Sequence, residues 1–158
     1  VYEVAHNIAK IEQHLVDGRQ QDVCVHRKGA TRAFGPGHSA LPASIRDLGQ
    51  PVLIPGDMGR YSWVMAGTEQ AMRSTFGSAC HGAGRMMSRR QALTNARGRS
   101  IIDELAAEGI SIMARNRSTI AEEMPEAYKD VAQVVTAIEE SGIARSVARL
   151  RPLAVLKG

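Results

Sequence analysis

The chain is organised around the stretch Pro51-Val52-Leu53-Ile54-Pro55-Gly56-Asp57-Met58-Gly59-Arg60-Tyr61-Ser62-Trp63-Val64-Met65-Ala66. The apolar run between two prolines predicts a short buried strand, and the apolar run after the turn predicts a second strand. The glycine-rich segment that separates them is a turn signal. Such a turn can aim backbone N–H groups at an anion, but the pattern alone favours an ordinary hairpin turn. It is no Walker loop, because GxxxxGK[ST] is absent.

The segments around this stretch alternate between strand and helix patterns. Residues 1–16 fit a helix or a strand equally well, and residues 34–49, rich in Gly, Pro and Ser, predict a long loop. Further strands are predicted at residues 21–26, 110–113 and 147–156, and helices at 89–97, 100–108 and 125–141. The chain is therefore predicted to be α+β, with mixed or antiparallel sheets and helices packed on them.

Composition narrows the class of protein. At 158 residues the chain is most simply one domain, and no apolar run approaches the roughly 20 residues of a membrane span. The first residues have neither the basic region nor the apolar core of a signal peptide. Two cysteines, Cys24 and Cys80, are typical of a reducing compartment, so we expect a cytoplasmic protein without a membrane partner. A net charge of +4 and a pI near 9.4 favour an anionic partner.

The stretch Phe76-Gly77-Ser78-Ala79-Cys80-His81-Gly82-Ala83-Gly84-Arg85 is the first candidate site. Its small residues let a large ligand approach the backbone, and arginine offers a fork for phosphate. Ser88 is a plausible N-cap for the next helix, whose free N–H groups would also suit a phosphate. His81 could act as a nucleophile, or it could be a structural histidine in a tight turn. The residues alone leave both interpretations open.

The other candidates are weaker by pattern alone. His6-Asn7 follows a short apolar segment, Arg27, Lys28 and Arg32 flank a glycine, and Lys157 lies near the last residue. A role in packing or on the solvated surface explains each of them at least as well as a role in binding. No two histidines have the i, i+4 spacing of a helical metal pair, so the spacing gives no complete metal site.

The motifs taken together resemble the C-terminal part of the RtcB family of RNA-splicing ligases. They are His6-Asn7, the run from His26 to Arg32, the run from Gly49 to Gly59, the run from Phe76 to Arg85, and Lys157-Gly158, in this order. The resemblance covers essentially all of residues 1–158. It implies the C-terminal portion of an RtcB-type catalytic domain, with the N-terminal portion absent.

The resemblance implies an RNA ligase that works in tRNA splicing and RNA repair. The family joins 2′,3′-cyclic phosphate or 3′-phosphate ends to 5′-hydroxyl ends, with GTP as co-substrate and two Mn²⁺ ions. It implies that His81 is guanylylated and that His6 binds manganese. It also implies a guanylate pocket, with Arg85 and Arg89, and less strongly Arg27, Lys28 and Arg32, on GTP or RNA phosphates. The pocket residues would be Asn7, Pro55, Gly56, Asp57, Met58, Ser62, Gly82, Ala83, Gly84 and Lys157.

One departure limits this resemblance. Family members are much longer, and their N-terminal portion supplies the aspartate, the bridging cysteine and two further histidines of the manganese pair. Cys24 and Cys80 do not lie in the motif of that cysteine. We therefore expect ligation of tRNA halves or broken RNA only together with the missing portion. The alternative is an inactive fragment that binds guanine nucleotide or RNA. Surface that the missing portion would cover could also make the fragment self-associate.

Overall fold

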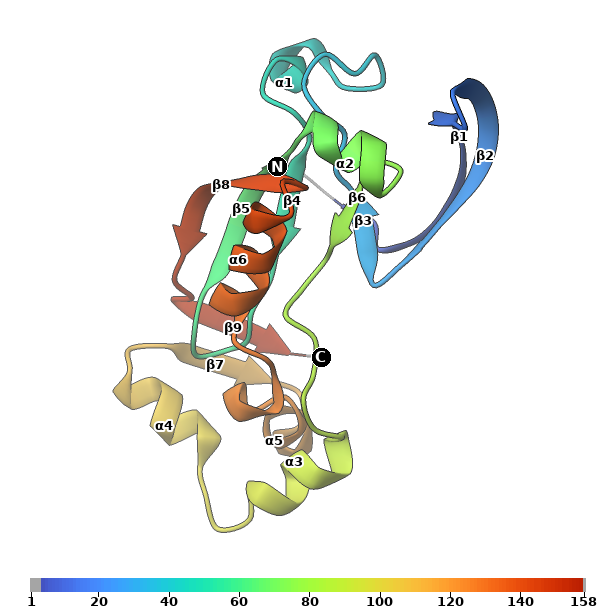
Figure 1. Cartoon of the computed structure of the whole chain (residues 1–158). Helices are drawn as coiled ribbons and strands as arrows, with labels where there is room; N and C mark the ends of the chain where they lie inside the picture. Colours follow the sequence, from blue (N-terminus) through green and yellow to red (C-terminus); the bar gives the residue numbers. More distant parts are fainter. Residues whose placement is uncertain (1–3, 158) are drawn as a thin grey trace.

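The predicted hairpin forms the centre of the fold (Figure 1). A computed structural model describes residues 4–157. Strand β4 (Pro51–Ile54) pairs antiparallel with β5 (Ser62–Gly67), and β5 pairs antiparallel with β8 (Ala144–Leu150). The result is a three-stranded sheet in the order β4-β5-β8. Prolines on both sides of the first strand and the glycines of the turn produce this hairpin, as the sequence predicts.

Helix α6 (Val131–Glu140) packs on this sheet because one of its faces is apolar. Val131, Val135 and Ile138 recur at spacings of four and three residues and join Val52, Ile54 and Met65 in one buried cluster. The Asp130 carboxylate caps the helix by accepting a hydrogen bond from the Ala132 N–H at 2.8 Å. The first core of the protein therefore lies between α6 and the β4-β5-β8 sheet.

The prediction that one helix runs over residues 125–141 is wrong at its start. Residues Pro125–Ala127 form a single 3₁₀ turn (η1), Tyr128 is extended, and the α-helix begins only after Asp130. The Arg60 guanidinium donates hydrogen bonds to the carbonyls of Pro125 and Tyr128, both at 3.0 Å. Those carbonyls therefore accept hydrogen bonds from a side chain distant in sequence instead of from backbone N–H groups of an α-helix. The interruption exposes Tyr128 to the candidate site described below.

A second core lies among the helices α3 (Arg89–Asn95), α4 (Ile101–Ala107) and α5 (Arg117–Glu122). They pack against a parallel pair of strands, β7 (Ser111–Ala114) and β9 (Ala154–Lys157) (Figure 1). Ser88 and Ser100 cap α3 and α4. The last strand, predicted over residues 147–156, is divided into β8 and β9 by a break at Arg151-Pro152-Leu153, so it serves both cores.

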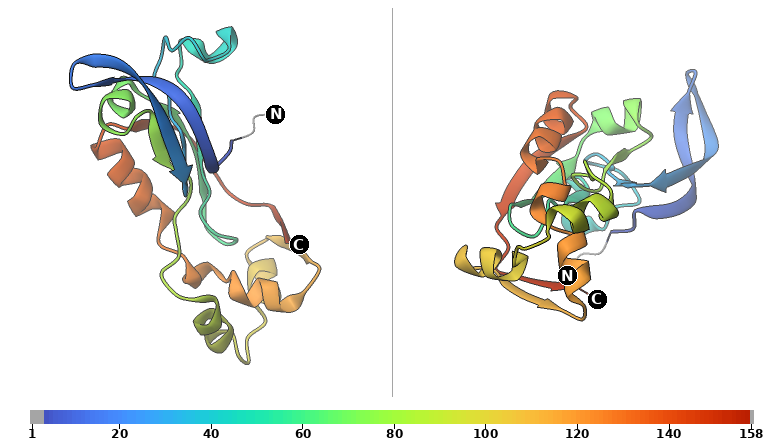
Figure 2. Two further views of the ribbon diagram at one scale, coloured as in Figure 1. Left: turned by 90° about the vertical axis from the view of Figure 1, so that its right-hand side faces the viewer. Right: turned by 90° about the horizontal axis from the view of Figure 1, so that it is seen from below.

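A long hairpin projects from this body (Figures 1 and 2). Strands β1 (Asn7–Val16) and β2 (Arg19–Lys28) pair in an unbroken antiparallel register. Asp17 and Gly18, both at positive φ, make the two-residue turn. Residues 1–16 fitted a helix or a strand by sequence, and the structure shows a strand from Asn7 to Val16. Residues 1–3 lie outside the described part. The hairpin leads into β3 (Ala30–Arg32), which pairs with β6 (Ser78–Cys80).

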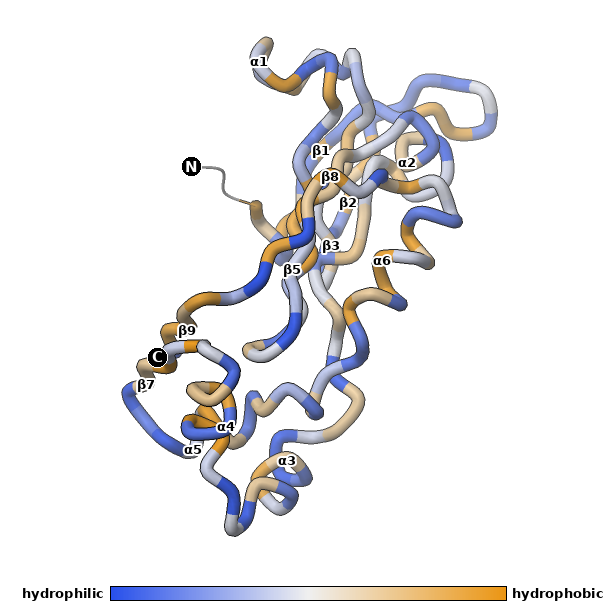
Figure 3. Tube along the Cα trace, turned by 90° about the vertical axis from the view of Figure 1, so that its left-hand side faces the viewer, coloured by the Kyte–Doolittle hydropathy of each residue, from blue (hydrophilic) through white to orange (hydrophobic). Residues whose placement is uncertain are grey.

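Two short helices complete the described chain. Helix α1 (Ala43–Arg46) lies inside the predicted loop, and α2 (Glu69–Ser74), capped by Thr68, was not predicted. The α+β class is confirmed. Within residues 4–157, none of the helices combines the length and the apolar character that crossing a membrane requires. Met113, Leu153 and Leu156 are 70–80% exposed on and beside the β7–β9 pair, where Figure 3 colours stretches of the chain as hydrophobic.

Candidate functional site

The predicted pocket residues gather around one cavity of about 860 Å³. Its walls are the turn after β4, the segment after β6, and β9. Volumes of 300–1,000 Å³ are usual for small-molecule and cofactor sites, so the cavity has room for a nucleotide. The predicted residues that line it are Pro55, Gly56, Asp57, Met58, Ser62, His81, Gly82, Ala83, Gly84, Arg85, Arg89 and Lys157.

Backbone hydrogen bonds hold the segment after β6 in this position. The His81 N–H donates to the Gly29 carbonyl at 3.4 Å, and the Ala83 N–H donates to the Pro55 carbonyl at 3.1 Å. Gly84 has φ +75, a conformation that a residue with a Cβ adopts only under strain. Its carbonyl accepts from the Lys129 N–H at 3.0 Å. The glycines near His81 thus let the chain pass close to β4 and to the start of α6.

Asp57 shapes the turn and does not present its carboxylate to a ligand. The carboxylate is fully buried and accepts hydrogen bonds from the N–H groups of Gly59 at 2.9 Å and Arg60 at 3.0 Å. It also pairs with the Arg60 guanidinium. A carboxylate facing the cavity would repel phosphate, whereas this one is held inside the turn by two backbone N–H groups and a guanidinium.

His81 stacks against His6, with ring centroids 4.2 Å apart and an angle of 17° between the planes. Burial, and secondly the charge of His6, lower the pKa of His81 below its ordinary value. The His81 imidazole is therefore neutral near pH 7, the form in which a ring nitrogen has a free lone pair. Asn7 is exposed at the start of β1 and does not line the cavity.

The described residues do not by themselves fit a metal ion. Within residues 4–157, no three His, Cys, Asp or Glu side chains form a group arranged to hold one. A protein metal centre usually takes at least three protein ligands. His6 and His81 lie face to face, so a metal bound beside them needs ligands from beyond the described residues.

Among the cavity residues that sequence reasoning missed, Glu123 and Tyr128 carry the polar side chains. Both make close contacts with the Arg85 guanidinium: its Nη1 lies 3.0 Å from Glu123 Oε1 and 3.2 Å from Tyr128 Oη. Lys157 Nζ lies 3.6 Å from Glu123 Oε2. Tyr128 was hidden inside a predicted helix, and Glu123 precedes a proline without any motif. The neighbourhood of Pro125, a helix breaker, was the only available signal.

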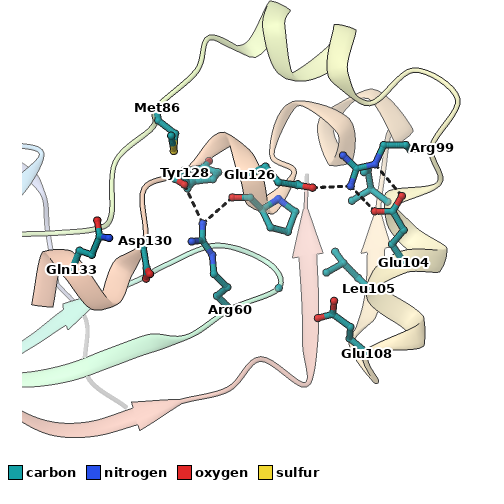
Figure 4. Close-up of a pocket in the computed structure, with 13 residues that line it drawn as sticks. Arg60, Met86, Arg99, Glu104, Leu105, Glu108, Glu126, Tyr128, Asp130 and Gln133 are labelled. Carbon is teal, nitrogen blue, oxygen red and sulfur yellow. Dashed lines mark hydrogen bonds and ion pairs between the residues drawn. The ribbon is translucent and has the colours of Figure 1, made fainter.

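A second cavity, of about 670 Å³, shares Tyr128 with the first. Figure 4 shows it, with Arg60 pointing to the carbonyls around Tyr128 and with Arg99 paired to Glu104 and Glu126. None of the predicted site residues lines it. The candidate site is therefore the first cavity.

The three predicted basic residues at the end of β2 and in β3 do not line the cavity. Arg27 is 2% exposed and is paired with Glu12, with two nitrogen–oxygen distances of 2.8 and 2.7 Å. Arg32 lies over the Phe34 ring, 5.1 Å from its centroid. Lys28 is exposed at the end of β2. The buried pair leaves Arg27 no face for a phosphate, so we replace that interpretation by a structural role.

Comparison with known proteins places this site in a family. The model for tRNA-splicing ligase RtcB matches residues 1–158. The chain belongs to the RtcB family. The whole chain is 59% identical to an RtcB tRNA-splicing ligase of Pyrococcus furiosus and 56% identical to that of Archaeoglobus fulgidus. It covers 16% and 33% of those two proteins, so it spans no more than about a third of these RtcB relatives.

Proposed function

We propose that this chain supplies the guanylate-accepting part of an RNA ligase. It would be the C-terminal portion of the catalytic domain and would act in the cytoplasm on tRNA halves or broken RNA. The convergence of His81, the turn after β4 and Lys157 on one nucleotide-sized cavity carries the proposal. Membership of a family of tRNA-splicing ligases supports the reaction class.

The proposed reaction has three displacements at phosphorus. A nitrogen of neutral His81 attacks the α-phosphate of GTP, a P–N bond forms, and pyrophosphate leaves. An oxygen of the RNA 3′-phosphate then takes the guanylate, which restores the imidazole. Finally the 5′-hydroxyl oxygen attacks the activated 3′-phosphate, loses its proton, and displaces GMP. A histidine intermediate divides one difficult transfer into two easier ones.

The residues of this chain would bind and orient the guanylate. The two glycine-rich segments line the cavity, and Arg89 and Lys157 bring positive charge to its edge. The two Mn²⁺ ions of the family would neutralise phosphate charge, with His6 as one ligand and the others from the portion of the ligase that lies outside this chain.

Transfer of radioactive label from α-³²P-GTP to protein tests the proposal. We expect the complete ligase with Mn²⁺ to take up acid-labile label, and His81→Ala to abolish it. His26→Ala, which alters an exposed histidine of the projecting hairpin, is the matched control and should label normally. A wild-type ligase that takes no label, or label that survives His81→Ala, would refute the proposal.

The alternative is that the isolated chain only binds guanine nucleotide or RNA. The absence of a three-ligand metal group from residues 4–157 favours it for the chain alone. Salt-sensitive binding of GTP or RNA that persists in His81→Ala, without any label transfer, is the result expected from this alternative.

A further inference from the structure

Glu123 is an acidic residue that lies close to three basic side chains of the cavity. Its side chain is 14% exposed, and its carboxylate contacts Arg85 at 3.0 Å, Lys157 at 3.6 Å and Arg89 at 3.8 Å. It also accepts a hydrogen bond from the Tyr128 hydroxyl. One carboxylate thus faces three cations, and Glu122 also pairs with Arg89 at 3.4 Å, so one positive charge remains for an anionic ligand. Without it the three cations would repel each other across the cavity wall.

The partners of Glu123 differ in how firmly they are held. Arg85 has other anchors, because it donates to the carbonyls of Glu122 at 2.6 Å and Met87 at 3.2 Å. Lys157 is 31% exposed on β9, and among the described residues Glu123 is the one carboxylate within 4.0 Å of its ammonium group. Loss of the carboxylate should therefore release Lys157 and Tyr128 more than Arg85.

Glu123 itself is fixed by the backbone. It follows the last residue of α5, and its N–H donates to the carbonyls of Thr119 and Ile120, both at 3.2 Å. It joins α5 to β9, which lies 34 positions further along the chain. Burial would raise the pKa of the Glu123 carboxyl, but the Tyr128 hydrogen bond and the nearby cations outweigh it, and the pKa is lowered. The carboxylate is therefore charged at neutral pH.

We propose that Glu123 is a positioning residue of the nucleotide cavity. It holds the Lys157 ammonium and the Tyr128 ring against the cavity wall and acts on the nucleotide through them. This rests on the proposed function, since a nucleotide must be the ligand. The substitution Glu123→Gln keeps the size of the side chain and removes the charge that holds Lys157.

The test compares four variants of the complete ligase: Glu123→Gln, Lys157→Met, the double variant, and Glu126→Gln. The last is the matched control, because Glu126 loses the same charge three positions away, where it pairs with Arg99 outside the cavity. We expect Glu123→Gln to raise the KM for GTP in histidine labelling about tenfold and to change the maximal rate less than twofold. The double variant should be less impaired than the two single effects multiplied, because the part of the Glu123 effect that acts through Lys157 is already lost in Lys157→Met.

Three results decide the matter. If Glu123→Gln keeps the wild-type KM, or if the two changes multiply in the double variant, the positioning role is refuted. If the maximal rate and the melting temperature fall together without a change in KM, Glu123 is only structural and the proposal also fails. A wild-type ligase that neither labels nor binds a fluorescent GTP analogue would overturn both this inference and the proposed function.

Discussion

Replacing Arg27 by methionine should lower the free energy of unfolding without directly affecting a ligand. Arg27 is buried and donates from Nε to Ser78 Oγ at 2.9 Å, from both terminal nitrogens to Glu12, and to the Phe76 carbonyl at 2.9 Å. These bonds attach the projecting hairpin to the segment that leads to His81. Methionine fills similar space but makes none of them.

The size of the effect follows from what is left behind. Glu12 would remain nearly buried, with a side chain 10% exposed, and would keep only His14 as a partner. Breaking a buried ion pair by removing one partner costs about 3–5 kcal/mol. That is a large part of the roughly 5–15 kcal/mol that separates folded from unfolded domains. The control Lys28→Met changes an exposed neighbour and should cost at most about 0.5 kcal/mol.

Urea unfolding, followed by the fluorescence of the single tryptophan Trp63, measures both variants. The pair Glu12→Met and Arg27→Met should be less damaging together than the sum of the two single changes, since no unpaired charge remains. If Arg27→Met is as stable as Lys28→Met while binding of GTP weakens, the structural interpretation of Arg27 is refuted. Arg27 would then be a phosphate-binding residue.

The same pair makes stability depend on pH. Burial would raise the pKa of Glu12, but hydrogen bonds and charges from Arg27 and His14 outweigh it and lower the pKa below its ordinary 4.5. A carboxyl whose pKa is lowered by folding stabilises the fold above its unfolded pKa and loses that contribution as pH falls through its folded pKa. The stability difference between wild type and Arg27→Met should therefore narrow below about pH 4.5. A difference that stays constant down to pH 3 would contradict this account.

Three further predictions concern the turn, the cap and the exposed surface. Gly84→Ala should lower the free energy of unfolding in urea by about 1–2 kcal/mol, because φ is +75 at this position. No heavy atom crowds an added Cβ, so the backbone conformation alone accounts for this loss. A neutral effect would show that the turn relaxes. Asp130→Ala should cost about 0.5–2 kcal/mol by the loss of the α6 cap, whereas Asp130→Asn, which keeps a capping oxygen, should cost less. The isolated chain should self-associate in light scattering, and Leu153→Ser with Met113→Ser should weaken this; a monomer at every concentration would exclude it.

The sequence predicts best what neighbouring residues decide. The β4–β5 hairpin and the cap Ser88 follow from local patterns and are confirmed. The start of α6 does not, because Arg60, more than 60 positions away, takes the carbonyls of Pro125 and Tyr128. For β1 the sequence left a helix possible, because Ile11 and Leu15 are four residues apart, which is a helical spacing. In the structure both lie on the projecting hairpin and are 70% and 66% exposed, so this spacing does not mark the buried face of a helix.

The site shows the same division. The residues next to His81 could be predicted because the motif that carries them is continuous. Glu123 and Tyr128 could not, because they reach the cavity through pairings with Arg85 across 38 and 43 positions. Such pairings depend on how α5 and the start of α6 pack, and no local pattern encodes that.

The arginines show most clearly why residue type alone cannot assign function. The sequence offers Arg85 and Arg89, and less strongly Arg27, as forks for phosphate. In the structure Arg27 is fully engaged in the hairpin junction, and Arg85 is held by two carbonyls, Glu123 and Tyr128. Arg89 is 68% exposed at the cavity and is held only by ion pairs at 3.4 and 3.8 Å. An exposed pair of this kind is worth about 0–1 kcal/mol, so a phosphate can displace it at little cost. Arg89 is thus the arginine best placed to bind the anion, while Arg85 and Arg27 shape the cavity and its support.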